Sequence, residues 1–296
     1  MKRILLTGGS GFIGRNIRES FLAEKYEMVS PSHKEVNWAD SEAMDAWFST
    51  RSFDAVIHAA VKPGHRNAPD HEHLLYTNTR MFFNLVRHAD RCGRILNIGS
   101  GAIYDMRHYE PAMKEDFFGR YMPEDEHGYT KYICGKYMER CQEDVVDLRV
   151  FGIFGRYEDY AIRFISNAIC KTLFDLPVTL RQDRVFSYLA VEDLMPVLDY
   201  FIEHKPRHKA YNVVPDERVS LLDLARRVVR ISGKDLPVKV GMPGMGMEYS
   251  GDNARLRAEM GDRLSFTPVE QSVRRLYGWY QEHKGELDRE CLLFDK

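Results

Sequence analysis

The sequence of 296 residues contains only five cysteines, and they are scattered along the chain. They form no Cys-x-x-Cys pair, which argues against a disulfide framework or a zinc site and favours free thiols in a reducing compartment. The five are Cys92, Cys134, Cys141, Cys170 and Cys291. No apolar run approaches a membrane span, and the one near the N-terminus is too short for a signal peptide. We therefore expect a cytoplasmic protein that does not insert into membranes.

The sequence also lacks a strong excess of charge of either sign. The net charge is -2, so the composition gives no reason to expect nucleic acid as a partner. The segment "HRNAPDHEH" contains His65, His71 and His73, but no cysteine or second pair stands at ligand spacing. We therefore expect no metal site, and His65 and Arg66 remain candidates to face a small-molecule substrate.

A glycine-rich turn stands near the start of the chain, in "KRILLTGGSGFIGRNIRESF". The apolar run before it, Ile4 to Leu6, predicts a buried parallel strand, and apolar residues at helical spacing follow it. Glycines at such a turn allow a tight bend and a close approach of the backbone to a diphosphate, next to a helix N-terminus. This pattern predicts a dinucleotide site, although a plain strand-to-helix turn rich in glycine would look similar. The residues expected to bind the cofactor here are Gly8, Gly11, Phe12, Ile13 and Gly14.

The predicted second strand, Glu27 to Ser30, ends without an acidic residue. An acid at this place commonly binds the adenosine ribose of NAD. Ser32, His33 and Lys34 follow instead, and hydroxyls with a cation suit a ribose 2′-phosphate. The segment favours NADP over NAD as the cofactor, but a solvated polar loop explains it equally well.

Further apolar runs predict more strands of the same sheet. "FDAVIHAAV" ends in the small residues Ala59 and Ala60, which let a flat cofactor lie close to the strand end. The run "GRILNIGS" ends at Ser100, and another strand is expected around Val146 to Phe151. Helical stretches separate these strands, so we expect a doubly wound parallel α/β sheet of the Rossmann type. Ligands bind outside the carboxyl ends of such strands, where the glycine turn, Ala59 and Ser100 would meet.

The character of the sequence changes after Gly155. We expect residues 1–155 to form the NAD(P)-binding domain and residues 156–296 mainly a smaller C-terminal α/β lobe that binds the substrate. Residues 183–215 are expected to return to the first domain.

Several motifs occur in a fixed order along the whole chain. They are "TGGSGFIG", "HAAV", "GSGAIYD", "GYTKYICGKY" and "DNARLRAEMG". With them the chain resembles the extended short-chain dehydrogenase/reductases, also called the NAD-dependent epimerase/dehydratase family, which act on nucleotide sugars. The segment 30–62 looks most like that of GDP-fucose synthases and dTDP-4-dehydrorhamnose reductases.

The resemblance implies an active site built from a Ser or Thr, a Tyr and a Lys. Ser100 matches the Ser, and Lys131 matches the Lys, which in the family also holds the nicotinamide ribose. The residue four before Lys131 is His127, where the family has its proton-carrying Tyr. Residues four apart share a helix face, and His is a common general acid, so His127 is our candidate for the Tyr's role. The pair Tyr132 and Lys136 has the right spacing but would face away, whereas Tyr129 and Tyr104 could lean into the same crevice and rank below His127 as candidates.

The resemblance also gives candidates for substrate binding. Tyr104 follows the Ser100 motif, Arg163 aligns near a second family active-site position, and Arg184 stands two residues before Phe186, where the family has a diphosphate-binding Arg. The expected activity is reduction of a nucleotide-linked 4-keto sugar. Two alternatives stay open: a nucleotide-sugar 4-epimerase, and a cofactor-binding protein whose site has lost its chemistry. Family members usually pair through two helices, so a homodimer is also expected.

Overall fold

A computed structural model describes residues 1–65 and 67–293 and contains one six-stranded parallel sheet. The strands lie in the order β10-β5-β4-β3-β1-β2, so the chain steps outward from β1 in both directions, as in a doubly wound fold. The strand bounds are β1 Arg3–Thr7, β2 Glu27–Val29, β3 Ala55–His58, β4 Arg94–Ser100, β5 Val145–Val150 and β10 Ala210–Val213. The predicted fold class is confirmed.

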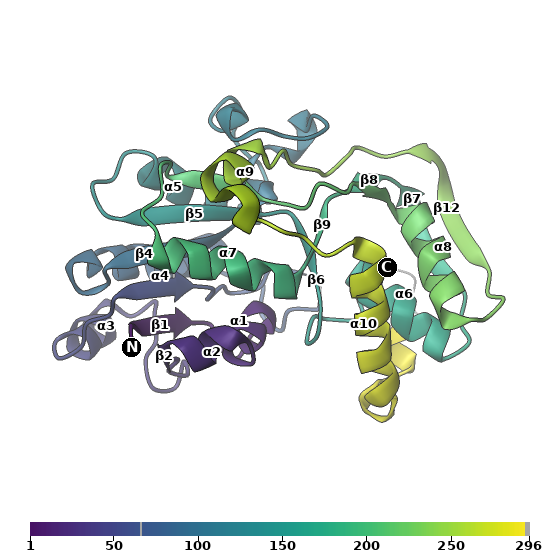
Figure 1. Ribbon diagram of the computed structural model, residues 1–296, viewed down its shortest axis with the longest axis horizontal. Coiled ribbons are helices and arrows are strands. Elements are labelled where there is room, and N and C mark those ends of the chain that lie inside the picture. Colours follow the sequence, from purple (N-terminus) through teal and green to yellow (C-terminus); the bar gives the residue numbers. More distant parts are fainter. Residues whose placement is uncertain (66, 294–296) are drawn as a thin grey trace.

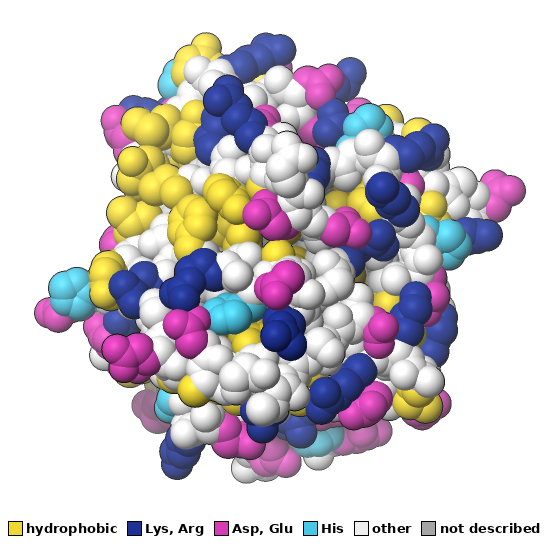
Figure 2. Space-filling model, turned by 90° about the vertical axis from the view of Figure 1, so that its left-hand side faces the viewer, with side chains coloured by type: hydrophobic (Ala, Val, Ile, Leu, Met, Phe, Trp, Pro, Cys, Tyr) yellow, Lys and Arg dark blue, Asp and Glu magenta, His cyan; other side chains and the backbone are white. Residues whose placement is uncertain are grey.

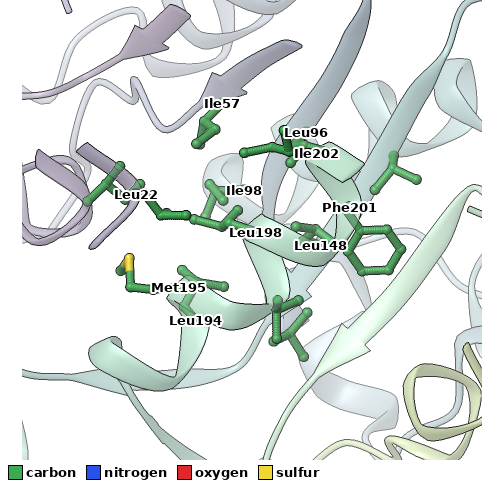
Figure 3. Close-up of a cluster of buried hydrophobic side chains, with 14 of the residues drawn as sticks. Leu22, Ile57, Leu96, Ile98, Leu148, Leu194, Met195, Leu198, Phe201 and Ile202 are labelled. Atoms are coloured by element: carbon green, nitrogen blue, oxygen red, sulfur yellow. The ribbon is translucent and has the colours of Figure 1, made fainter. Parts of the chain in front are cut away.

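Helices cover both faces of this sheet (Figure 1). One face carries α3 (Ser41–Phe48), α4 (Leu74–Val86) and α5 (Glu126–Met138), and the other carries α1 (Phe12–Arg18), α2 (Phe21–Lys25) and α7 (Val191–Glu203). Consecutive strand residues point to opposite faces, so Ile95 belongs to the first core and Leu96 to the second. Figure 3 shows the second core, where Leu194, Leu198 and Phe201 of α7 lie against Leu96, Ile98 and Leu148 of the sheet.

A smaller lobe follows β5 and has a hydrophobic core of its own. Its strands β7 (Val178–Asp183) and β12 (Val238–Met245) pair in parallel, and α6 (Phe164–Leu173), α8 (Leu221–Ser232) and α10 (Val269–Glu282) pack beside them. The remaining elements are β6 Gly152–Phe154, β8 Val185–Phe186, β9 Tyr188–Ala190, β11 Val219–Ser220 and α9 Ala254–Met260. Seven 3-10 turns complete the described structure: Ala89–Arg91, Gly101–Ile103, Met106–His108, Glu115–Phe117, Gly261–Arg263, Lys284–Glu286 and Glu290–Leu292.

The segment expected to return to the first sheet is divided between the two parts. Its beginning, β8 and β9, pairs with β11 and β6, whereas α7 and β10 join the six-stranded sheet and its core. The two parts are therefore connected by several chain crossings, and Figure 1 shows β6 and β9 running between them. No helix among the described residues is long and apolar enough to span a membrane.

Candidate active site

A cavity of about 860 Å³ lies where the carboxyl ends of the central strands meet the smaller lobe. Its wall combines residues from the start of helix α1, the segment directly after β3, the end of β4, helix α5 and the smaller lobe. The predicted site residues in this wall are Phe12, Ile13, Ala59, Ala60, Ser100, His127, Lys131, Arg163 and Arg184. Sequence positions more than a hundred residues apart thus contribute to one chamber.

The glycine turn is shaped by close backbone approaches. Gly8 has φ +74°, and a Cβ atom there would lie 2.7 Å from the backbone of Ala60. A Cβ atom at Gly14 would collide with the carbonyl oxygen of Gly8, so the first turn of α1 can pack against β1 only with glycine at this position. Gly11 donates its N–H to Gly8 over 3.0 Å, and a side chain there would project into largely open space. None of the three glycines lines the cavity wall itself.

The loop after β2 differs from its sequence interpretation in one respect. Ser32, His33 and Lys34 are exposed and lie outside the cavity wall. The backbone N–H and the hydroxyl of Ser32 both donate to Glu35 Oε2, each over 2.8 Å. The loop that was expected to bind the 2′-phosphate of NADP therefore carries the carboxylate of Glu35, which is hydrogen-bonded to Ser32. These bonds lower the pKa of Glu35, so the group is negatively charged at neutral pH.

Ser100 and Lys131 are each held by a hydrogen bond with the backbone. The Ser100 hydroxyl oxygen accepts a hydrogen bond from the backbone N–H of Ala102 over 3.1 Å, which leaves its O–H free to donate. The ammonium group of Lys131 donates to the carbonyl oxygen of Ile98 over 3.1 Å. Burial lowers the pKa of Lys131. Both side chains thus have fixed positions in the same wall.

His127 lies in the first turn of α5, at the mouth of the cavity. Asp125 caps this helix by accepting the N–H of Gly128 over 2.7 Å, which sets where the helix begins. The pKa of His127 is lowered to about 4, first by desolvation of the charged ring and then by Lys131, with Arg163 adding to the effect and Asp125 opposing it. The residue keeps a solvent-exposed surface. His127 is therefore a neutral imidazole at pH 7.

A second histidine, His58, lies in the sheet interior below the site and is 6% exposed. Its Nδ1 atom is 2.9 Å from the hydroxyl of Thr7, which also accepts the N–H of Ala60 over 3.2 Å. Burial, and then the charge of Lys131, lowers the pKa of His58 to about 3. This group links the ends of β1 and β3 and does not line the cavity.

Tyr249 enters the same wall from the segment after β12, and sequence analysis did not identify it. Its phenol lies within hydrogen-bonding reach of the side chains of Ser100 and Tyr109. Its ring packs against Phe151 and Phe186, with ring centroids 5.0 Å and 5.6 Å apart. The segment has neither periodicity nor a motif, so only its place in the fold reveals it.

Two of the predicted substrate-binding cations line the cavity. Arg184 is held by a 2.8 Å hydrogen bond from Nε to the carbonyl oxygen of Met247, and its guanidinium lies 5.2 Å from the centre of the Phe186 ring. The positive charge of Arg163 lowers the pKa of Glu158 and of His127, so its guanidinium lies near both groups. Both positive charges are thus available to an anionic ligand.

The third expected substrate residue, Tyr104, is not in the cavity wall, and this expectation was wrong. Its side chain is 1% exposed, and its hydroxyl donates to Asn212 Oδ1 over 2.8 Å. Arg149, itself paired with Asp147, donates to the same hydroxyl over 3.0 Å. Tyr104 therefore belongs to a buried polar network that ties β5 to β10.

A buried carboxyl that no sequence motif marks also lines the cavity. Glu158 is 7% exposed and accepts a short hydrogen bond from Ser166. Burial raises its pKa to about 8, so it is largely protonated at neutral pH. Among the described residues no group of three His, Cys, Asp or Glu side chains is placed to hold a metal. His65 is outside the cavity wall, and Arg66 lies outside the described residues.

The family model for NAD dependent epimerases and dehydratases matches residues 4–214. The chain belongs to this family. The match includes the six-stranded sheet, the glycine turn, Ser100 and Lys131. The predicted resemblance is thereby confirmed.

Individual relatives are more distant. A GDP-L-fucose synthase of Azorhizobium caulinodans is 30% identical over 107 residues, which cover 35% of this chain and 34% of that protein. This match therefore spans about a third of the relative's length. A GDP-mannoheptose C4 reductase from Campylobacter jejuni, solved with NADP bound, has a TM-score of 0.80 at 15% identity, covering 95% of this chain and 98% of that one. A UDP-glucose 4-epimerase from Thermotoga maritima, solved with UDP-glucose, has the same TM-score at 17% identity, with coverage of 95% and 99%. These structures share the fold.

Proposed function

We propose that the protein is an NAD(P)-dependent oxidoreductase of nucleotide-sugar metabolism that reduces a 4-keto sugar. The observation that supports this most is the cavity that joins the start of α1, directly after the glycine turn, to Ser100, Lys131 and His127 on one side and to two arginines on the other. A reduction needs a hydride donor, a proton donor and a group that holds the carbonyl oxygen. The cavity offers a place for each.

The residues present fit a nicotinamide dinucleotide. Gly8 and Gly14 make room for a backbone turn that no larger residue could form, and Gly11 faces open space where a diphosphate can approach. Phe12 and Ile13 line the chamber at the start of α1, and Ala59 and Ala60 keep the end of β3 flat. Lys131 is placed to hold the nicotinamide ribose, as the family resemblance implies.

The bound cofactor would supply a hydride to the carbonyl carbon of the sugar. Ser100 would donate its free O–H to the carbonyl oxygen and hold it in place. His127, neutral at pH 7, would donate one N–H to the same oxygen. The positive charge of Lys131 would stabilise the negative charge that develops there.

Arg163 and Arg184 are proposed to bind the diphosphate of the nucleotide sugar. They lie in the part of the cavity wall that the smaller lobe contributes, and anionic oxygens pair well with guanidinium groups. Phe186, at the usual arginine position, stacks on Tyr188 with ring centroids 5.0 Å apart. The diphosphate would therefore be bound by Arg163 and Arg184, and not by an arginine at position 186, where the family pattern places one.

The cofactor preference remains open between NADP and NAD. The exposed Lys34 and His33 favour a 2′-phosphate, whereas the carboxylate of Glu35 at Ser32 disfavours one. Because a loop carboxylate commonly binds the 2′-hydroxyl of NAD, we propose that the protein accepts both cofactors and that Glu35 limits the preference for NADP.

A homodimer is proposed through helices α4 and α5. Figure 2 shows a group of hydrophobic side chains gathered at the upper left of the surface in view. An open groove between the helices includes Leu75, Phe83 and Ile133, together with Tyr76, which is 60% exposed. Exposed aromatic residues of this kind are typical of protein interfaces.

Two other functions remain possible for this site, a 4-epimerase and a cofactor-binding protein without turnover. The low pKa of His127 is the observation that motivates the second, because a neutral imidazole is a weak acid. Tight retention of cofactor through purification would favour the epimerase.

The proposal is tested by titrating the protein with NADPH and NADH, followed by turnover with nucleotide-linked 4-keto sugars. We expect the wild type to bind at least one cofactor tightly and to turn over a substrate. His127→Tyr should be as active as the wild type or more active, and His127→Phe should be inactive. Equal rates for His127→Phe and the wild type would contradict the role of His127. Cofactor binding without any turnover would instead identify the protein as a cofactor-binding protein.

A further inference from the structure

We propose that Tyr249 is the proton donor of this active site. It would replace the catalytic tyrosine that other family members carry at the position of His127. The inference rests on the proposed reduction, and it assigns the proton to a residue outside the family motif. It would explain how the chain retains the fold, Ser100 and Lys131 while it carries a histidine on α5.

Tyr249 lies where a proton donor must lie. It shares the cavity wall with Ser100, His127 and Lys131, and its phenol is within hydrogen-bonding reach of the Ser100 side chain. Ser100 is the residue expected to hold the carbonyl oxygen. A phenol that contacts Ser100 is therefore close to the place where the reacting oxygen would lie.

The backbone fixes this position. The N–H of Tyr249 donates to the carbonyl oxygen of Val185 over 2.8 Å, and its own carbonyl oxygen accepts the N–H of Ser187 over 3.1 Å. The next residue, Ser250, accepts the N–H of Ala112 at its hydroxyl over 2.8 Å. The segment is thus tied to two other parts of the chain, and the phenol is held before a substrate arrives.

The ring environment connects Tyr249 with a second departure from the family pattern. Phe186 replaces the family's arginine, and its ring meets that of Tyr249 at 65° with centroids 5.6 Å apart. Phe151 and Tyr109 complete the contact at centroid distances of 5.0 Å and 5.2 Å. The aromatic side chain at position 186 is part of the wall that orients the phenol.

Burial keeps the phenol of Tyr249 in its protonated form, so a proton is present when negative charge develops on the substrate oxygen. Burial raises the pKa of Tyr249 to about 12, while the contacts with Ser100 and Tyr109 and the positive charge of Arg163 lower it and Asp125 opposes them. The phenol is therefore protonated at neutral pH. His127, with a pKa of about 4, carries no extra proton under the same conditions.

The carbonyl carbon gains a hydride from the reduced nicotinamide, and the carbonyl oxygen gains the phenol proton of Tyr249 as the O–H bond of the phenol breaks. The phenolate then recovers a proton from water. His127 keeps its N–H throughout and serves as a hydrogen-bond donor that positions the same oxygen.

The test compares Tyr249→Phe in two backgrounds, the wild type and His127→Tyr. In the wild type we expect kcat to fall by about 100-fold or more, with KM and the Kd for NADPH nearly unchanged. In the His127→Tyr background a phenol is present on α5, so Tyr249→Phe should cost only a few-fold. Tyr132→Phe is the matched control, because its ring packs on Phe118 and lies outside the cavity wall.

A merely structural role for Tyr249 would reduce the rate equally in both backgrounds, since independent effects add. That result, or a Tyr249→Phe rate equal to that of Tyr132→Phe, would overturn this inference and leave the proposed reduction standing. A fluorotyrosine at position 249 gives a second measurement: activity should be retained, and the alkaline limb of the pH–rate profile should move to lower pH. An unmoved limb would count against Tyr249. A wild type that reduces no nucleotide-linked keto sugar would overturn the proposed function and this inference together.

Discussion

The ammonium group of Lys131 lies 3.1 Å from the carbonyl oxygen of Ile98, so the helix that carries His127 is tied to the strand that ends at Ser100. This contact brings three of the predicted catalytic positions into one wall. It also places a buried positive charge next to both His127 and His58, whose pKa values it lowers.

Replacement of Lys131 separates an enzyme from a protein that only binds a cofactor. Lys131→Met should weaken NADPH binding and reduce turnover by about 100-fold or more, because it removes the charge that stabilises the developing negative oxygen. Lys136→Met is a suitable control, since Lys136 pairs with Glu139 and lies outside the cavity wall. Steady-state kinetics with both variants checks this, and equal kcat values for the two would contradict the assigned role.

The buried neutral His58 predicts a loss of stability in acid. Its folded pKa of about 3 lies below the ordinary value of 6.5, so the unfolded chain binds the proton more readily. Stability from this group is present above pH 6.5 and is lost as the pH falls toward 3, by about 2 kcal/mol between neutral pH and pH 5. Urea unfolding at both pH values should show a shallower pH dependence for His58→Asn than for the wild type. A variant slope as steep as that of the control His71→Asn would be inconsistent with this account.

The contact between Ser32 and Glu35 predicts how cofactor preference can be changed. Glu35→Gln removes a negative charge from the loop that we propose to lie beside the adenosine end, and it should raise the affinity for NADPH relative to NADH a few-fold. Fluorescence titrations with both cofactors measure the ratio. Glu42→Gln, on the exposed surface of α3, should leave it unchanged. If both variants show the wild-type ratio, Glu35 does not contact the cofactor.

The sheet and the glycine turn were predictable because they depend on local patterns. Buried strands appear in the sequence as apolar runs that end in small residues. The close backbone contacts around Gly8 and Gly14 require glycine, so they too can be recognised from the sequence. Ser100 and Lys131 could be found because a motif marks them.

Contacts between distant segments could not be predicted in this way. Tyr249 reaches the site through backbone bonds to β8, although no motif or periodicity marks its segment of the sequence. Tyr104, in contrast, was predicted to bind the substrate and does not line the cavity. It stands beside the Ser100 motif, yet its ring turns inward to Asn212. Only the tertiary fold decides such orientations.

The inward position of Tyr104 has a measurable consequence. Tyr104→Phe leaves a donor of Arg149 and the Oδ1 atom of Asn212 without a partner, which should cost about 1–3 kcal/mol of stability. Because the residue is outside the cavity wall, the Kd for NADPH should not change. Urea unfolding and cofactor titration together check this. Weaker cofactor binding at an unchanged free energy of unfolding would instead show that Tyr104 belongs to the site.

The central claim is that this cavity transfers a hydride from a nicotinamide to the carbonyl carbon of a nucleotide-linked keto sugar. The most direct test mixes the protein with deuterium-labelled NADPH and GDP-, UDP- or dTDP-linked 4-keto sugars, and locates the label in the sugar by mass spectrometry and NMR. The account predicts loss of nicotinamide fluorescence and deuterium on carbon 4 of at least one sugar. Bound, unoxidised cofactor and unlabelled sugar in every case would contradict it.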